Sequence, residues 1–286
     1  MELKEFEYKL ENFDRITHGN PFHADDVFSE ALIELYAEKQ KLNIKRLFRT
    51  FKVPDDFQGI VFDIGKGEFD HHQEVETREN NKIPYASFGK LWRLLGREFF
   101  DFNIEESFET IDSKIVCPID LADNFGQQKA PNSLSYMISS FNEVNEKGSR
   151  NFFVAVNIAK QLLSQVIKSQ NQINEKEQII LSLVNQHKDD DYLVLKEFIP
   201  WGKSLINTNI KFVIFPSNRG GYNINLVYND EGSYKIPLPE GWIENPPEDL
   251  NITFIHKTGF LIAVKDKDSA INVVKRILSI YDENRI

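Results

Sequence analysis

The stretch FDIGKGEFDHHQE, residues 62–74, sets His71 and His72 side by side behind Asp70, a short distance after Asp63. Imidazole and carboxylate groups in this mixture suit manganese, and also zinc or iron. Asp63 ends the apolar run GIVFD, so we expect its carboxylate to project from the end of a strand. The two glycines of the stretch allow a tight turn back to the histidine pair. Metal coordination and a solvated turn are the two interpretations of this pattern.

A second cluster lies upstream, in THGNPFHADD. It places His18 and His23 on a loop after a predicted strand, with Asp25 and Asp26 at the start of the next helix. Carboxylates suit the first turn of a helix, because they cap its free N–H groups and face the positive end of its dipole. Capping alone therefore accounts for either aspartate. With two histidines beside them we favour ligation.

A third cluster, IDLADNFG, offers Asp120 and Asp123 within one helical turn. By itself it is typical of an exposed acidic turn. In the company of the other two clusters it supplies one more carboxylate, from Asp120 or Asp123. A carboxylate shared by two ions about 3.5 to 4 Å apart lets one ion activate water while the other binds phosphoryl oxygens. The three clusters together favour a two-metal hydrolytic site.

The elements that must position these residues alternate along the first half of the chain. Short β-like runs such as FDRITHG and FQGIVFDIG are separated by amphipathic helical segments. This order predicts βαβ units, a mostly parallel sheet and an α/β fold. Ligands of such sheets collect at the carboxyl ends of the strands, which is where the clusters fall.

The chain is expected to form two domains. We predict a metal-bearing catalytic domain over residues 1–150 and a helical connector over 151–191, which contains the polar stretch SQNQINEKEQ. Short β-rich segments, separated by turns such as NRGG and NPPED, then predict a smaller α+β domain over 192–286. We expect this domain to cover the substrate.

Charge and cysteine content exclude several classes of protein. With 44 acidic and 34 basic residues, a net charge of -10 and a pI near 5.2, the surface as a whole repels a polyanion, unless metal ions and local Arg or Lys supply a positive field. Cys117 is the single cysteine, so an intrachain disulfide and a thiolate-rich zinc site are excluded. There is neither an apolar run long enough for a membrane span nor a secretion signal, so we expect a soluble, cytoplasmic protein.

The order of these motifs resembles the DHH phosphoesterase superfamily, whose four motifs build a dinuclear metal site. Within it, THGNPFHADD, FDIGKGEFDHHQ, YASFGKLW and IDLADN look most like the melanocyte-proliferating-gene branch, long labelled metal-dependent protein hydrolases. Eukaryotic members of that branch are described as 3'-to-5' RNA exonucleases. The resemblance continues through FIPWGKSL, IPLPEGW and FIHKTGF, so it covers nearly the whole chain.

The resemblance implies two ions of Mn²⁺, with Mg²⁺ or another divalent ion as the alternative. It implies a first metal held by His18, His23 and Asp63, and a second held by Asp25, Asp63, His71 and Asp123. Asp63 would bridge the two ions, His72 would contact the substrate phosphate, and Asp70 would orient a histidine.

The chain departs from the superfamily pattern in two places. The first motif, usually His-x3-Asp-x-Asp, becomes His18-x4-His23-x-Asp25, and the loop HKTGFLIAV lacks the glycine pair that commonly follows the family's phenylalanine. Near that loop and in NRGG, Lys257 and Arg219 are candidates for binding the substrate's phosphate.

The function that these observations favour is a metal-dependent phosphoesterase that hydrolyses phosphodiester bonds. The branch points to a 3'-to-5' exonuclease on RNA or short oligonucleotides, and the acidic pI favours short substrates. A small-molecule phosphatase or pyrophosphatase would use the same metal site. A metal-stabilised interaction protein without turnover is the third hypothesis, which the altered HKTGFLIAV loop keeps open.

Overall fold

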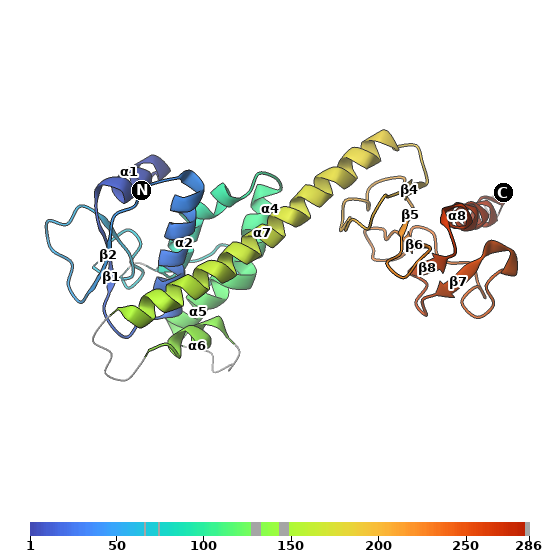
Figure 1. Cartoon of the computed structure of the whole chain (residues 1–286). Coiled ribbons are helices and arrows are strands. Elements are labelled where there is room, and N and C mark those ends of the chain that lie inside the picture. Colours follow the sequence, from blue (N-terminus) through green and yellow to red (C-terminus); the bar gives the residue numbers. More distant parts are fainter. Residues whose placement is uncertain (66, 74, 127–132, 143–148, 284–286) are drawn as a thin grey trace. The chain divides into compact units, whose positions relative to one another are not determined.

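The computed structural model describes residues 1–65, 67–73, 75–126, 133–142 and 149–283 (Figure 1). The chain forms two compact units, Met1–Asn171 and Gln172–Ile286. The division falls inside a single long helix, α7 (Arg150–Gln186), within the polar stretch SQNQINEKEQ. The segment expected as a connector is therefore largely one continuous helix.

The first unit extends past the expected boundary at residue 150 because the first half of α7 belongs to its core. Phe152, Ala155 and Ala159 are fully buried there. The Nζ atom of Lys160 also lies 2.9 Å from a carboxylate oxygen of Glu34 on the neighbouring helix. The sequence pattern predicted where α7 becomes polar. It did not predict that the apolar face of the helix before this polar stretch packs into the core of the first unit.

A small parallel sheet organises the first unit. Its strands are β1 (Arg15–His18), β2 (Leu47–Thr50) and β3 (Ile60–Val61), in the order β2-β1-β3. Both neighbours run parallel to β1, and the register pairs His18 with Thr50 and Ile16 with Val61. Together with the mixed sheet of the second unit, this confirms the α/β prediction.

Helices surround this sheet and supply most of the apolar core. They are α1 (Leu3–Asn12), α2 (Ala24–Gln40), α3 (Ser87–Leu95), η1 (Gly96–Phe99), α4 (Ile104–Ile111), the π-helical turn η2 (Asp112–Val116), α5 (Cys117–Phe125) and α6 (Leu134–Ser139). The central helix α2 is buried along most of its length, and Phe28 on it contacts Phe88 of α3. Within the described residues, no helix of the chain is long and apolar enough to cross a membrane.

The second unit is built on a five-stranded mixed sheet. Its strands are β4 (Tyr192–Val194), β5 (Phe212–Pro216), β6 (Tyr222–Leu226), β7 (Ile252–Ile255) and β8 (Leu261–Val264), in the order β4-β5-β6-β8-β7. Only β4 and β5 are parallel. The short turn η3 (Glu248–Leu250) precedes β7, and α8 (Lys267–Glu283) packs its Val273, Val274 and Ile277 into the core of the sheet. This is the α+β arrangement expected for the C-terminal part.

Candidate metal centre

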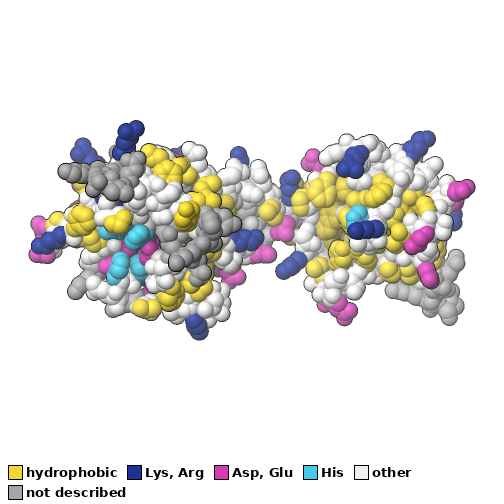
Figure 2. Space-filling view, turned by 90° about the horizontal axis from the view of Figure 1, so that it is seen from below, with side chains coloured by type: hydrophobic (Ala, Val, Ile, Leu, Met, Phe, Trp, Pro, Cys, Tyr) yellow, Lys and Arg dark blue, Asp and Glu magenta, His cyan; other side chains and the backbone are white. Residues whose placement is uncertain are grey.

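The three sequence clusters meet at the carboxyl edge of the parallel sheet. His18 is the last residue of β1, Asp63 follows β3 closely, and α2 begins at Ala24 beside His23. Because parallel strands end at the same edge, these residues share one region. In Figure 2 the histidines and carboxylates gather on one face of the first unit, with hydrophobic side chains next to them.

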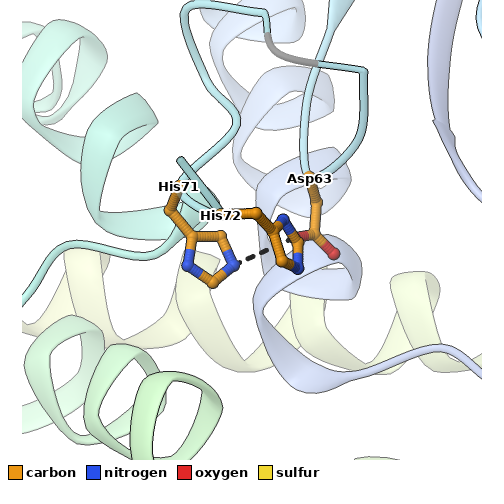
Figure 3. Close-up of side chains that lie close together, drawn as sticks. All are labelled: Asp63, His71 and His72. Atoms are coloured by element: carbon orange, nitrogen blue, oxygen red, sulfur yellow. Dashed lines mark hydrogen bonds and ion pairs between the residues drawn. The ribbon is translucent and has the colours of Figure 1, made fainter. Parts of the chain in front are cut away.

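Asp63 lies at the centre of the cluster. Its Oδ2 is 2.9 Å from Nε2 of His18. Its Oδ1 is 3.1 Å from Nε2 of His71, a contact shown in Figure 3. Asp63 has a φ of 57°, in the left-handed region that non-glycine residues seldom occupy. Such a conformation persists where the surroundings over-determine it, and it is concentrated at functional sites.

The turn after Asp63 depends on Gly65. This glycine has a φ of 79°, and a Cβ atom there would lie 2.6 Å from Cγ2 of Val53. Any larger residue would be strained in its backbone and would clash with Val53. Gly65 therefore lets the loop return to the histidine pair, as the sequence pattern suggested.

His71 joins Asp63 to the third cluster. Its Nε2 is 3.0 Å from Oδ2 of Asp123 and 4.0 Å from Oδ2 of Asp25. The other ring nitrogen, Nδ1, lies 3.3 Å from Oδ1 of Asn124. An outer hydrogen bond of this kind fixes which nitrogen of a histidine faces a metal. Asn124, which directly follows Asp123, was not among the residues predicted for the site.

Asp26 enters the cluster where the sequence analysis had placed His23. Oδ2 of Asp26 is 3.1 Å from Nε2 of His18, while Oδ1 accepts a hydrogen bond of 2.9 Å from the backbone N–H of His23. The side chain therefore both caps α2 and faces the metal-ligand candidates. Its position directly after Asp25, in HADD, was the available signal. Helix capping was a sufficient explanation for Asp26 from the sequence alone, but capping and the contact with His18 use different oxygens of its carboxylate.

His23 contacts the other part of the cluster. Its Nδ1 is 3.4 Å from Oδ1 of Asp123, and about half of the side chain is exposed. As the cap of α2 it approaches the helix from outside, whereas Asp26 approaches from within the first turn. The geometry thus groups His18 with Asp26 and Asp63.

Within the part of the chain that the structure describes, three groups of donor atoms are close enough together for each to hold a metal ion. They are Asp63, His71 and His72; Asp25, Asp63, His71 and Asp123; and His18, Asp26 and Asp63. The second group coincides with the set that the resemblance implies for the second metal. Asp63 belongs to all three groups, which is the arrangement that a bridging carboxylate requires.

His72 and Asp70 form a pair at the mouth of the cluster. Oδ1 of Asp70 is 2.6 Å from Nδ1 of His72 and also accepts a hydrogen bond of 3.1 Å from its backbone N–H. Asp70 is buried, whereas 59% of the His72 side chain is exposed. A buried carboxylate therefore holds an accessible imidazole in place, with Nε2 as the ring nitrogen left for another group.

Asp25 is the residue whose surroundings best fit a bound cation. Its side chain is fully buried, and neither carboxylate oxygen has a hydrogen-bond donor among the described residues. Its close neighbour is a second carboxylate, Asp123, an approach that needs a proton or a cation between the two. A buried carboxylate with no compensating partner costs several kcal/mol. The site fits a divalent cation, because carboxylate oxygens and imidazole nitrogens are ligands for such ions.

Proton affinities within the cluster show the same shortage of positive charge. Burial lowers the pKa of His18, but hydrogen bonds and attraction to Asp26 and Asp63 outweigh it and raise that pKa to about 10. The pKa of His71 likewise rises to about 10, since Asp123 and Asp63 overcome the effect of burial. Burial, followed by repulsion from Asp63 and Asp123, holds the pKa of Asp25 well above its usual range. In the protein alone, bound protons balance the carboxylates that a metal ion would otherwise neutralise.

Asp120, the alternative to Asp123, has a structural role. One of its oxygens lies 2.8 Å from Nη2 of Arg78, and the other accepts a hydrogen bond of 3.1 Å from the backbone N–H of Gly89. A Cβ atom on Gly89 would lie 1.9 Å from Asp120 Oδ2, so the carboxylate occupies the space that this glycine leaves. Burial raises the pKa of Asp120 to about 7, with Arg78 opposing the shift.

The two candidates for phosphate binding, Arg219 and Lys257, lie in the second unit. Arg219 is on the turn between β5 and β6, Lys257 is on the turn between β7 and β8, and both side chains are exposed. The strand register places these turns at opposite ends of the sheet, about 13 Å apart for strands of this length. They therefore do not form one anion pocket with each other.

Two cavities flank the cluster, and His23 lines both. One, of about 420 Å³, is lined by His18, Asp63, Asp70 and His72 among others. The other, of about 320 Å³, has Asp25 and Asp123 on its wall together with apolar side chains such as Ile119. Both sides of the cluster thus have room for a small group or one end of a larger molecule.

Comparison with known proteins places the chain in a family. Residues 15–278 match the model of the MYG1 family, which is described as an uncharacterised protein family (UPF0160). The chain belongs to the MYG1 family. Membership of the melanocyte-proliferating-gene family is thereby confirmed, whereas the DHH superfamily stays a prediction, and the match spans the candidate metal centre and most of the second unit.

Two relatives from this family align over almost their whole length. A MYG1 protein of Dictyostelium discoideum is 22% identical, with 92% of this chain and 95% of that protein covered. The MYG1 protein C27H6.8 of Caenorhabditis elegans is also 22% identical, with 94% and 96% covered. A solved structure, that of the exonuclease RecJ bound to manganese, covers 97% of this chain and 93% of its own at 12% identity and a TM-score of 0.30. A likeness that low supports no statement about activity.

Proposed function

We propose that this MYG1-family protein is a metal-dependent phosphoesterase of the DHH type that hydrolyses phosphodiester bonds. The observation that carries the proposal is the fully buried carboxylate of Asp25, which has no hydrogen-bond donor among the described residues and lies beside donor groups that share Asp63. Within this class we propose a 3'-to-5' exonuclease acting on RNA or short oligonucleotides.

Two divalent ions, Mn²⁺ in our proposal, would be held by the groups that share Asp63, one on the His18 and Asp26 side and one on the Asp25, His71 and Asp123 side. When bound, such a pair activates water and offsets the charge that develops on phosphoryl oxygens. The remaining work falls to the side chains around them.

His72 is placed to act on the substrate. Because its Nδ1 is held by Asp70, the exposed ring is oriented before the substrate arrives, which lowers the entropic cost of contact. Its Nε2 can donate a hydrogen bond to a phosphate oxygen or pass a proton to the leaving group. Asn124 sets the orientation of His71 in the same way, through Nδ1. We further propose that the second unit contributes substrate contacts through the Arg219 turn or the Lys257 turn.

A panel of RNA, DNA, dinucleotide and pyrophosphate substrates, assayed with Mn²⁺, tests this function. We expect nucleotides to be released one at a time from the 3' end of RNA, and Asp25→Asn to abolish that release. Asp101→Asn is a matched control, since Asp101 is an exposed aspartate of the same unit. Release of phosphate from pyrophosphate alone would favour the phosphatase alternative. Bound metal without turnover on any substrate would favour an interaction protein.

A further inference from the structure

The edge strand β2 and its continuation carry cationic and aromatic side chains that the metal centre does not use. Residues 45–52 read KRLFRTFK, with four cations and no carboxylate, in a chain of net charge -10. Lys45, Arg46, Phe48, Phe51 and Lys52 are exposed. Among the described residues, no carboxylate forms an ion pair with Lys45, Arg46 or Lys52. This segment is a local reversal of the protein's overall charge.

The segment runs toward the metal centre. β2 lies parallel to β1 at the edge of the sheet, and its Thr50 is paired with the ligand candidate His18. Neighbouring strands are about 4.8 Å apart, so Phe51, the next residue, lies beside the cluster. Phe48 precedes it by roughly 10 Å along the strand. The backbone of the segment thus approaches the cluster, with Phe51 nearest to it and Phe48 and the exposed cations Lys45 and Arg46 farther away along the chain.

Phe51 is fixed in position yet open to solvent. A Cβ atom on Gly19 would lie 2.6 to 2.9 Å from three atoms of the Phe51 ring, so the ring rests on the backbone next to His18. Even so, 81% of the residue is exposed, and Phe48 is 48% exposed. A phenylalanine left in water forgoes the stabilisation that burial of its ring would bring. Two such rings beside a phosphodiesterase site suit stacking against a planar ligand.

Arg49 has a different role from its neighbours. Its guanidinium donates a hydrogen bond of 2.6 Å to Oδ1 of Asn20 and lies 4.3 Å from the centre of the Phe152 ring. It ties β2 to the loop after β1 and to α7. The contacts offered to a ligand are therefore those of the two exposed rings and the exposed lysines and Arg46.

We propose that residues 45–52 bind a single-stranded nucleic acid and lead its end to the metal centre. The inference rests on the proposed function and adds the path of the substrate. Cations along the strand contact successive phosphates, and the rings of Phe48 and Phe51 stack on bases, which a single strand exposes and a duplex hides. Stacking of this kind does not distinguish one base from another, so the binding is independent of sequence.

Binding of a labelled single-stranded RNA of about 12 nucleotides, within the range of known site sizes, tests the proposal. The RNA carries hydrolysis-resistant phosphorothioate linkages, so that anisotropy with the full-length, metal-loaded protein reports binding without turnover. We expect Phe51→Ala to weaken binding about 5- to 100-fold, as loss of one stacked base does. Lys52→Gln should weaken it and reduce the slope of log Kd against log salt by about 0.7, as loss of one phosphate contact does.

The matched controls lie outside residues 45–52, on helices of the same unit and away from the metal-centre residues. Tyr8, 59% exposed on α1, is an aromatic residue near the amino end of β1, and Lys39 is an exposed cation in the last turn of α2. Tyr8→Ala and Lys39→Gln should bind as the wild type does. Since Phe51 and Lys52 are exposed, thermal denaturation should show that all four variants are folded.

Three results would overturn the inference. One is that Phe51→Ala and Lys52→Gln bind the RNA as tightly as the controls do. Another is that the two substitutions weaken binding of a duplex RNA as much as they weaken binding of a single-stranded RNA. The third is that sedimentation shows them to dissociate an oligomer, which would assign the segment to contacts between copies of this chain. A wild-type protein that hydrolyses no phosphodiester would contradict the proposed function instead, and the binding comparison does not depend on that assay.

Discussion

The substitution Asp63→Asn tests the metal centre at its most connected residue. Asp63 belongs to all three donor groups and contacts His18 at 2.9 Å and His71 at 3.1 Å through different oxygens. Asparagine keeps the size of the side chain but removes its charge and one acceptor oxygen. Because the carboxylate is 3% exposed, water cannot readily replace it.

The expected loss is large. At an effective dielectric constant of about 20, two opposite unit charges 4 Å apart attract each other by about 4 kcal/mol, and a carboxylate and a divalent ion attract each other by about twice that. Even if neighbouring ligands and water recover half of this energy, about 4 kcal/mol is lost, which corresponds to roughly 10³-fold. We therefore expect phosphodiester hydrolysis to fall by at least about 10³-fold, with both ions weakened together.

Two measurements check the loss of bound metal, and both are independent of turnover. Elemental analysis counts the bound Mn²⁺. Thermal denaturation with and without Mn²⁺ measures linkage, since a ligand at 100 times its Kd adds about 2.7 kcal/mol, or roughly 5 to 10 °C for a unit of this size. The wild type and the control Asp101→Asn should show this rise, and Asp63→Asn should not. If Asp63→Asn retained full metal content and normal hydrolysis, the bridging assignment would be wrong.

Three further predictions concern the surroundings of Asp63. His72→Ala should leave metal content near that of the wild type and lower hydrolysis by about 10² to 10⁴, as loss of one positioned acid or electrostatic group does; loss of metal would make it a ligand. Because His18 and His71 have pKa values of about 10 without metal, Mn²⁺ binding at pH 7.5 should release about two protons and should weaken as the pH falls. Calorimetry in buffers of different ionisation enthalpy measures the number of protons released, and metal binding without proton release would contradict the prediction. Arg78→Ala should destabilise the fold by about 3 to 5 kcal/mol, because it leaves the buried carboxylate of Asp120 without its cation. The control Arg93→Ala removes an exposed ion pair over the same ring, that of Tyr85, and should cost at most about 1 kcal/mol. Equal denaturation midpoints for the two variants would refute the distinction.

Several features of the site follow from the sequence with little help from the fold. The apolar run that ends at Asp63 and the segment that ends at His18 are both recognisable as short strands, and their parallel arrangement brings both ends to one edge. Gly65 marks the return of the loop, because its φ of 79° is available mainly to glycine. Local chemistry and periodicity were therefore enough to bring His18, Asp63 and His71 together.

Choices between neighbouring residues could not be made in this way. Asp120 and Asp123 share a helical turn and a residue type, and only the packing of Arg78 and Gly89 against Asp120 removes it from the site. Asp26 and His23 differ by the direction from which they approach the start of α2, which depends on how that helix is rotated in the core. The extent of the first unit, to Asn171, depends on which face of α7 is buried.

By itself, the sequence determined the kinds of ligand, their order and the strand ends that carry them, because these depend on side-chain chemistry and on periods of a few residues. The tertiary structure alone decided which carboxylate oxygens converge, that Asp25 is buried without a donor, and that Phe51 stays exposed beside Gly19. It also separated Arg219 and Lys257 to opposite ends of one sheet. These properties arise from contacts between segments far apart in the chain, whose geometry is set by packing and strand register and is not encoded in the local spacing of residues.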